Sequence, residues 1–449
     1  MNRRTIVLVH GGNGGAGFAS AGEKLFHPLL GRPLVSYVLA AAAGLQPGRI
    51  ALAVGDADRE PAAGAAASLA EAAGRVPFAL IRQRSGKGKT RSGILSALPG
   101  SSAALRKKRA FDILLVPADR PLLQPATLKA LLSVHRRQGC GMTLMTFGPD
   151  IDRDSVAAIR GEDLVPLLPA LAAARGESGL RAVAALLSAR GKRVGLTEAP
   201  EAGETMRVAG RADLARAARL LQRRKNEGLA RRGVTLLDPL SAWIDWEAEL
   251  GPGTVVYPAV VIEGATRVGK NCRIYPYVHI MGSRIGDGVK VLSSTVLDGC
   301  RLEDDVQVGP FSRLRPGTVV RTGSKVGNFV EMKNTVFGPR SKAQHLSYLG
   351  DSLVEEDVNV GAGTITCNYD GVRKNRTHIG AGAFIGSGTE LVAPVKVGKR
   401  AYVAAGSTIT KDVSPASLAI SRARQVEKPG WVLERMKKLQ RKNRSSKSR

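Results

Sequence analysis

The sequence contains few aromatic residues, few cysteines and no long apolar run. Phe, Trp and Tyr together make up 4% of its 449 residues. Its four cysteines lie far apart with no CxxC pair, which argues against a disulfide scaffold and a zinc module. No apolar run approaches the roughly 18 residues that a membrane-spanning helix needs, and the first apolar stretch is too short for a signal peptide. We therefore expect a cytoplasmic globular protein with no membrane partner.

Acidic residues are also scarce. The chain has 38 Asp and Glu against 67 Lys and Arg, a formal net charge of +29. Such an excess favours anionic partners, which include nucleic acid, a membrane surface and phosphorylated small molecules. The last residues, MKKLQRKNRSSKSR, are strongly basic, and we interpret them as a solvated, disordered tail. Because no aromatic side chain interleaves with these charges, we do not expect nucleic acid to be a partner.

The first half of the chain alternates strand-like and helix-like segments. Apolar runs at residues 5–9, 50–54, 112–116 and 142–147 are typical of strands, and Ala/Leu-rich segments such as 34–43 favour helices. This alternation predicts a Rossmann-like α/β domain with a parallel sheet covered by helices. An Ala/Leu/Arg-rich stretch that follows, RVAGRADLARAARLLQRRKNEGLARR, predicts a linker helix.

Aliphatic residues recur every six positions in the second half. One series runs from Ile244 to Ile280, and others cover residues 308–332 and 379–409. Neither a helix nor an antiparallel sheet keeps this step, whereas a triangular coil with six residues per side does. The pattern predicts a solenoid whose aliphatic side chains point inward. Solenoids need covered ends, and we expect the segment around Trp431 to cover one of them.

Polar side chains gather near one interruption of this six-residue frame. The frame breaks at residues 281–283 and 368–376, and such breaks are where a solenoid places function. A histidine can accept a proton from an attacking amine near neutral pH, and lysine or arginine can hold a phosphate. A packed surface histidine is the alternative interpretation. The polar residues in question are Lys333, His345, Tyr348, Asn359, Asn368 and Tyr369.

Several segments of the second half resemble the acetyltransferase half of the bacterial GlmU family. They are RLRPG, GNFVEMK, HLSYLGD, GAGTITCNYDG and AISR. The resemblance implies a left-handed parallel β-helix of hexapeptide repeats and a homotrimer with active sites at the subunit interfaces. It implies acetyl transfer from acetyl-CoA to the amine of glucosamine 1-phosphate, a step in UDP-N-acetylglucosamine biosynthesis.

The resemblance also implies roles for individual residues. His345 matches the general base of the family. The positions that match sugar-phosphate ligands are Arg315, Lys333, Tyr348, Asn359 and Lys374, the last supplied by a neighbouring subunit. The positions that match the acetyl-CoA site are Ala362, Asn368, Tyr369, Ser387, Ala405 and Arg422.

The first half resembles the uridyltransferase half of the same family less closely. The glycine-rich loop GGNGGAG implies nucleotide binding by Gly11 and Gly12, with Lys24 and Gly86 as further contacts. Asp119, in VPADRPLL, matches a magnesium ligand.

Other positions depart from the family pattern. The family's loop Thr and catalytic Arg are replaced by Ala16 and Gly17, and its second magnesium ligand by Ala209. Loss of an oxygen ligand weakens Mg²⁺ binding, and loss of the arginine weakens stabilisation of the triphosphate. We expect uridyl transfer from UTP to be absent or altered. A fully bifunctional enzyme is the alternative.

These observations divide the chain into four parts. They are a nucleotidyltransferase-like domain (1–203), a linker helix (204–235), a β-helix acetyltransferase domain (236–430) and an arm with a basic tail (431–449). An alternative of another class is a basic scaffold or nucleic-acid-binding protein on a solenoid fold. That alternative explains the charge but gives no purpose to the polar residues around His345.

Overall fold

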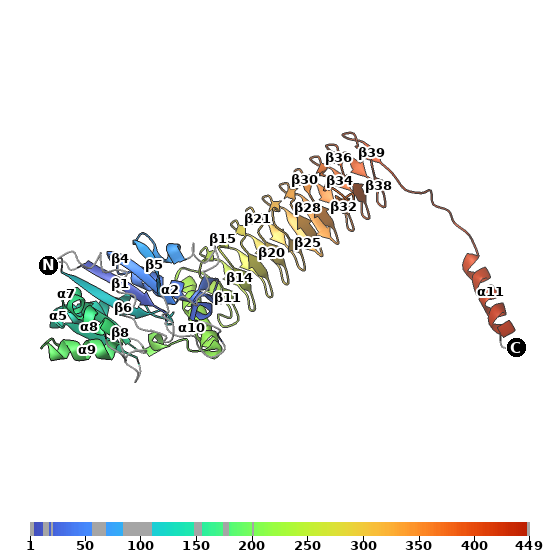
Figure 1. The fold of residues 1–449 in the computed structure, drawn as a ribbon. Coiled ribbons are helices and arrows are strands. Elements are labelled where there is room, and N and C mark those ends of the chain that lie inside the picture. Colours follow the sequence, from blue (N-terminus) through green and yellow to red (C-terminus); the bar gives the residue numbers. More distant parts are fainter. Residues whose placement is uncertain are drawn as a thin grey trace. The chain divides into compact units, whose positions relative to one another are not determined.

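A computed structural model (Figure 1) describes residues 4–11, 18, 21–55, 69–83, 110–147, 155–173, 179–199 and 202–446. The contacts divide the chain into two compact units. The first unit comprises Met1–Arg267 and His279–Gly282, and the second comprises Val268–Val278 and Ser283–Arg449. Among the described helices, none combines the length and apolar character that a membrane span requires.

A seven-stranded sheet forms the centre of the first unit, in the order β5-β4-β1-β6-β8-β7-β9. The strand-like runs of the sequence correspond to β1, β4, β6 and β7, and the helical segment at 34–43 is α2. The described elements are β1 (Arg4–His10), α1 (Ala21–Phe26), β2 (Pro28–Leu29), β3 (Arg32–Pro33), α2 (Leu34–Ala43), β4 (Arg49–Gly55), β5 (Phe78–Gln83), β6 (Phe111–Pro117), α5 (Pro125–Gln138), β7 (Met142–Thr146), β8 (Ser155–Arg160), α7 (Gly161–Leu164), α8 (Leu168–Ala173), α9 (Leu180–Ala189) and β9 (Val194–Thr197).

One strand departs from the predicted parallel arrangement. β8 runs antiparallel to both β6 and β7, whereas the other neighbouring strands are parallel. The segment between β7 and β8 is too short for the crossover helix that parallel neighbours need, so the chain returns in the opposite direction.

Both faces of this sheet are covered, because successive side chains of a strand point to opposite faces. Val7 and Val9 of β1 belong to one buried cluster, which also includes residues of α2 and α5. Leu8 belongs to a second cluster, which includes residues of α7, α8 and α9. The result is the three-layer α/β arrangement expected from the alternating sequence.

The linker helix α10 (Arg211–Arg231) is shorter than the predicted segment, 204–235. Asp213 caps its start by accepting hydrogen bonds from the backbone N–H groups of Ala209 and Gly210. Further along, the amides of Gln222 and Asn226 both donate to the carbonyl oxygen of Ala242, at 2.6 and 3.0 Å. The helix is thereby fastened to the first solenoid coil, which belongs to the same unit.

Short strands on three faces build a left-handed parallel β-helix. In the first unit these are β10 (Thr235–Leu236), β11 (Trp243–Ile244), β12 (Glu249–Leu250), β13 (Val255–Val256), β14 (Val261–Glu263) and β17 (His279–Met281), with β15 (Arg267–Val268) at the boundary. In the second unit, face 1 contains β16 (Arg273–Ile274), β19 (Lys290–Val291), β22 (Gln307–Val308), β25 (Lys325–Asn328), β28 (Lys342–His345), β31 (Asn359–Val360), β34 (Phe384–Ile385), β37 (Tyr402–Val403) and β39 (Leu418–Ala419).

Faces 2 and 3 complete each coil of the second unit. Face 2 contains β20 (Val296–Asp298), β23 (Arg313–Leu314), β26 (Glu331–Lys333), β29 (Tyr348–Gly350), β32 (Ile365–Cys367), β35 (Glu390–Val392) and β38 (Thr408–Ile409). Face 3 contains β18 (Arg284–Ile285), β21 (Arg301–Leu302), β24 (Val319–Val320), β27 (Val336–Phe337), β30 (Ser352–Val354), β33 (Thr377–Ile379) and β36 (Val395–Val397).

The strand register of these faces accounts for the six-residue step of the sequence. On face 1, Val326 pairs with Ala343, Ala343 with Val360, and Val360 with Ile385, and all four side chains are buried. Each aliphatic residue therefore stacks on its equivalent one coil away, as predicted. The frame also breaks where expected, since residues 368–376 separate β32 from β33.

The last described element is the helix α11 (Trp431–Ser446), so the basic tail is helical as far as Ser446 and not disordered as expected. Every residue from Ser421 to Gln440 is exposed. The expected packing of the segment around Trp431 over the end of the solenoid is therefore wrong for this part of the structure.

Candidate functional site

His345 lies at the end of β28, at the corner where face 1 turns into face 2. Its side chain is exposed, and its Nδ1 atom lies 2.8 Å from Oδ1 of Asn328, the residue paired with it one coil away. An amide oxygen only accepts hydrogen bonds, so Nδ1 carries the proton and Nε2 keeps its lone pair. This is the tautomer that a general base needs. Asn328, which stands in the GNFVEMK segment, was not among the predicted site residues.

Three of the predicted acetyl-CoA positions occupy this same corner in successive coils. The strand register makes Ala362, Ser387 and Ala405 the equivalents of His345 in the next three coils. Backbone hydrogen bonds connect the corner, since Gly388 donates to the carbonyl of Ala362 and Gly406 to that of Ser387. We call these four residues the histidine corner.

Arg422 extends the histidine corner by one more coil. Its guanidinium donates to the carbonyl oxygen of Ala405 at 2.7 Å. The corner residues Ser387 and Ala405 are exposed and their side chains are small, so they leave room for a long ligand to lie along the corner. A cation at the far end suits a phosphorylated ligand.

The predicted phosphate ligands gather at another corner, where face 2 turns into face 3. Arg315, Lys333 and the loop that contains Lys374 all lie there, and we call these three residues the lysine corner. Hydrogen bonding and repulsion by Lys374 lower the pKa of Lys333, with a smaller contribution from Arg315. Arg315 also donates to Glu331 at 3.0 Å. Crowded cations of this kind are relieved when an anion binds among them.

Asp351 organises the lysine corner. Its two carboxylate oxygens accept hydrogen bonds from the amides of Asn334 at 2.7 Å and Asn368 at 2.6 Å. Burial alone would raise the pKa of Asp351, but these amides together with Lys333 and Lys374 hold the pKa below its usual value. The carboxylate therefore stays ionised and fixes Asn368, which is itself buried.

Gly350 allows Tyr348 and Asn368 to approach each other. A Cβ atom at this position would lie 2.5 Å from the Tyr348 hydroxyl oxygen and 2.7 Å from Nδ2 of Asn368. The side chains of Tyr348 and Asn368 therefore approach each other over Gly350, where there is no room for a side chain. Asn359 is half-buried on face 1, and Tyr369 is exposed, with its hydroxyl donating to the carbonyl of Gly371.

Within one chain, the histidine and lysine corners flank face 2 without merging. Tyr348 lies on the face between them. Lys374 lies beside Lys333 of its own chain, and its contribution to a neighbouring subunit stays a prediction. A sugar phosphate that must reach both an imidazole and a lysine cluster would need these two kinds of corner to face each other.

In the first unit, Lys24 and Asp119 form a buried ion pair. The Lys24 ammonium lies 2.9 Å from Oδ2 of Asp119, and Arg207 contacts the same oxygen at 3.1 Å. Burial would raise the pKa of Asp119, but the two cations outweigh it and hold the pKa low. The pair lies at the carboxyl ends of β1 and β6, the edge of a parallel sheet where nucleotides bind.

His10, the last residue of β1, lies near this pair. Burial lowers its pKa to about 4, although the nearby Asp119 opposes the shift. The imidazole is therefore neutral at physiological pH.

The described residues do not form a magnesium site around Asp119. Its Oδ2 already carries two cations, and Ala209 supplies no side-chain oxygen. No cluster of three or more His, Cys, Asp or Glu side chains suited to a metal occurs among the residues that the structure describes. Mg²⁺ prefers one or two carboxylates together with phosphate oxygens and water, so Asp119 would have to give up its contacts with Lys24 and Arg207 to serve as a ligand.

The glycines predicted to bind a nucleotide are only partly described. Gly11 follows β1, and a Cβ atom there would lie 3.1 Å from the Leu25 side chain. Its lack of a side chain is thus explained by close packing. Gly12 and Gly86 lie outside the described residues.

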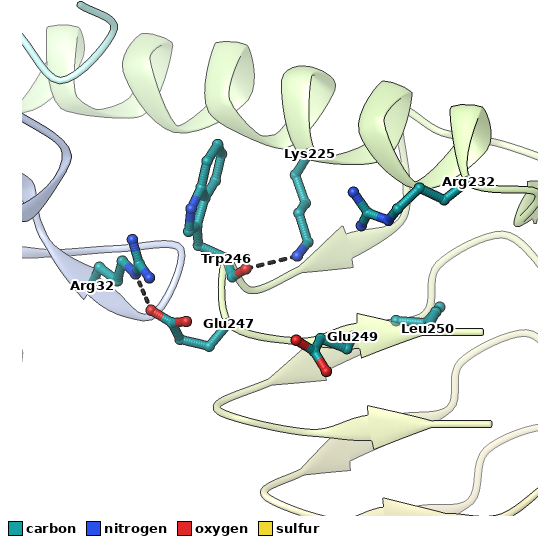
Figure 2. Close-up of a pocket in the computed structure, with 7 residues that line it drawn as sticks. All are labelled: Arg32, Lys225, Arg232, Trp246, Glu247, Glu249 and Leu250. Carbon is teal, nitrogen blue, oxygen red and sulfur yellow. Dashed lines mark hydrogen bonds and ion pairs between the residues drawn. The ribbon is translucent and has the colours of Figure 1, made fainter. Parts of the chain in front are cut away.

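A polar pocket of about 420 Å³ lies beside α10 in the first unit (Figure 2). Lys225 donates to the backbone carbonyls of Trp246 and Ala248, and Arg32 pairs with Glu247. Burial and the nearby Arg232 lower the pKa of Lys225 to about 8. None of the predicted site residues lines this pocket, and its paired charges hold α10 and the β2–β3 turn to the first coil.

Fold and site together define a two-part transferase, in which an α/β nucleotidyltransferase-type domain precedes a hexapeptide-repeat β-helix. Residues 12–194 match the family described as "MobA-like NTP transferase domain", and residues 376–411 match "Bacterial transferase hexapeptide (six repeats)".

Known relatives cover nearly the whole chain. "Bifunctional protein GlmU" of Pelobacter propionicus is 37% identical over 475 residues, which cover 97% of this chain and 99% of that protein. The protein of the same name from Thermotoga maritima is 39% identical over 467 residues, again 97% of this chain and 99% of that protein. That of Fervidobacterium nodosum is 50% identical over 236 residues, 53% of this chain and 52% of its own length. The chain belongs to the GlmU family.

Proposed function

We propose that the second unit transfers an acetyl group from acetyl-CoA to the amine of glucosamine 1-phosphate. The observation that carries this proposal is the histidine corner, where a base with a free Nε2 begins a column of small residues that ends at Arg422. The lysine corner supplies the cations that a sugar phosphate requires.

The proposed chemistry needs only acid–base catalysis. The sugar amine attacks the thioester carbonyl while Nε2 of His345 accepts a proton from the amine. The tetrahedral intermediate then expels the CoA thiolate, which the imidazolium protonates. Alignment of the two substrates contributes up to about 7–11 kcal/mol, and a positioned base contributes roughly 10²–10⁴-fold in rate.

The substitution His345→Ala tests the role of the base. We expect thiol release from acetyl-CoA with glucosamine 1-phosphate to fall by about a hundredfold or more, while the affinity for both substrates is retained. A loss of affinity for the substrates with unchanged turnover would show that His345 is not the base.

A homotrimer whose active sites are shared between subunits is part of the proposal. It is supported by the separation of the histidine and lysine corners on one chain. Co-expression of His345→Ala with Lys333→Met tests it, because each variant keeps the corner that the other has lost. We expect mixed oligomers to recover activity that neither variant has alone. No recovery in verified mixed oligomers would mean that one chain supplies the whole site.

Uridyl transfer from UTP to N-acetylglucosamine 1-phosphate is the second candidate function. The full-length similarity to proteins named bifunctional favours it over the expectation that this activity is absent or altered. Arg207, whose guanidinium is partly exposed at the edge of the sheet, is a suitable phosphate ligand. Pyrophosphate release from UTP, measured with and without Mg²⁺, tests this candidate.

A cytoplasmic location also stays a prediction.

A further inference from the structure

Two aromatic rings stack on the outer side of face 1, in the coils that contain the histidine corner. Phe384 of β34 and Tyr402 of β37 are paired in the strand register, with ring centres 4.4 Å apart and ring planes 13° from parallel. Tyr402 is 48% exposed, and Leu418 continues the column one coil further. Because the coil spacing itself holds the rings in contact, the pair presents a fixed aromatic surface.

The same outward column has a different composition in the earlier coils. The strand register places the following residues in it, in chain order: Lys290, Gln307, Lys325, Lys342, Asn359 and then Phe384. Aromatic side chains enter the column only in the coils that carry Ser387 and Ala405, two of the positions predicted to bind acetyl-CoA. The change from cationic to aromatic side chains therefore coincides with the acetyl-CoA positions.

A strip of bare backbone connects the rings to the histidine corner. Phe384 stands three residues before Ser387, and Gly386 lies between them. A Cβ atom at Gly386 would lie 2.4 Å from the backbone nitrogen of Ala405, so this position has no room for a side chain. The equivalent residue one coil on is Ala404, which is buried. A ligand that lies along the corner can therefore reach both rings without obstruction.

The trimer proposed above places face 1 on the outside. If a histidine corner of one chain meets a lysine corner of another, each chain turns face 2 toward the threefold axis, because both corners border that face. Face 1 then lies beside the open side of the channel along the histidine corner. The exposed cations of its earlier coils, Lys325 and Lys342, agree with a face in contact with water.

We propose that the stacked rings of Phe384 and Tyr402 hold the adenine ring of acetyl-CoA. This inference rests on the acetyl transfer proposed above. The thioester has to reach His345, so the pantetheine arm runs along the small residues of the histidine corner toward the coils of the two rings. Arg422 lies at the end of that path and suits the phosphates. Every purine has a π face that an aromatic surface binds.

Binding of CoA and of 4′-phosphopantetheine to the full chain, measured by calorimetry, tests the proposal. The second ligand has the same arm but lacks the adenine. We expect CoA to bind at least about tenfold more tightly. Tyr402→Ser should weaken CoA binding about tenfold and leave 4′-phosphopantetheine binding unchanged, whereas Tyr402→Phe, which keeps the ring, should behave as the native chain. Lys290→Ser is the matched control, because it truncates the same column outside these coils, and it should bind both ligands normally.

Three results would overturn the proposal. The first is a Tyr402→Ser variant that keeps the native preference for CoA. The second is equal weakening of both ligands, which would mean that the ring only supports the corner. The third is a smaller oligomer of Tyr402→Ser in gel filtration, which would assign the stacked pair to a contact between copies of the chain.

The binding experiment is separable from the proposed function, because CoA binds without a sugar acceptor. A chain that binds CoA through Tyr402 as expected, yet releases no thiol from acetyl-CoA with glucosamine 1-phosphate, would refute that acceptor and support the adenine site. Normal thiol release together with an unchanged ligand preference in Tyr402→Ser would refute only the adenine site.

Discussion

The side-chain oxygen of Asn328 fixes the ring of His345 from one coil away. The 2.8 Å contact to Nδ1 joins two residues that are paired in the strand register of face 1. Parallel stacking of coils thus does for this histidine what a carboxylate or carbonyl does for many catalytic histidines, because it selects the tautomer and the orientation of the ring.

The variant Asn328→Ala should lower kcat for acetyl transfer about tenfold, with little change in KM, because the base is still present but no longer held. Asn328→Asp is the informative partner, since a carboxylate beside Nδ1 raises the pKa of the imidazole. We expect it to shift the acidic limb of the kcat/KM profile to higher pH. Identical pH profiles for Asn328→Asp and the native chain would show that the contact does not act on the base.

The variant Gly350→Ala should raise the KM for glucosamine 1-phosphate. The added methyl group would collide with the Tyr348 hydroxyl and the Asn368 amide, so both ligands must move. Gly228→Ala is a suitable control, because its Cβ would lie 3.7 Å from Arg232 within a helix, where alanine is favourable. An unchanged KM for glucosamine 1-phosphate in Gly350→Ala would mean that Tyr348 does not contact the sugar.

Asp119→Asn should destabilise the first unit by about 3 kcal/mol, because it leaves a buried lysine without its carboxylate. In a Trp431→Phe background, fluorescence of the remaining Trp243 and Trp246 reports unfolding of this unit. Glu227→Gln in α10, which breaks exposed ion pairs with Arg223 and Arg231, should cost no more than about 1 kcal/mol. Equal costs for the two variants would contradict a structural role for the buried pair.

The stability of the first unit should fall as the pH drops from 6.5 toward 4. His10 has its pKa lowered from 6.5 to about 4 by burial, so in this range the unfolded chain binds a proton that the folded chain does not. The linked loss is about 3 kcal/mol at the low end of the range. The same fluorescence experiment on His10→Gln should show a flatter dependence on pH, and an unchanged slope would assign the acid sensitivity to other groups.

Much of the fold could be predicted because its determinants are periodic. The six-residue step from Ile244 onward fixes the coil, and strand runs such as 112–116 fix the sheet. The antiparallel strand β8 could not be predicted, since its direction follows from a short connection and not from its own composition. For α11, the basic composition was evident, but it indicated a solvated, disordered tail and not a helix.

The candidate site, too, could be predicted only in part from the sequence. Residue types at motif positions pointed to His345, Lys333 and Lys374. Their distribution over two corners required the register of the coils, because neighbours across coils, such as Asn328 and His345, are 17 residues apart in sequence. The support that Asn328 and Asp351 give was missed for that reason.

The length of the histidine corner depends on the number of coils that it spans. Each coil advances the corner by one strand spacing, about 4.8 Å, so the separation between His345 and Arg422 is set by how many coils lie between them. Deleting one complete coil there would shorten the histidine corner by one strand spacing and leave the imidazole in place. The number of repeats would then determine the length of the ligand that fits. The residue at the first repeat would determine the chemistry.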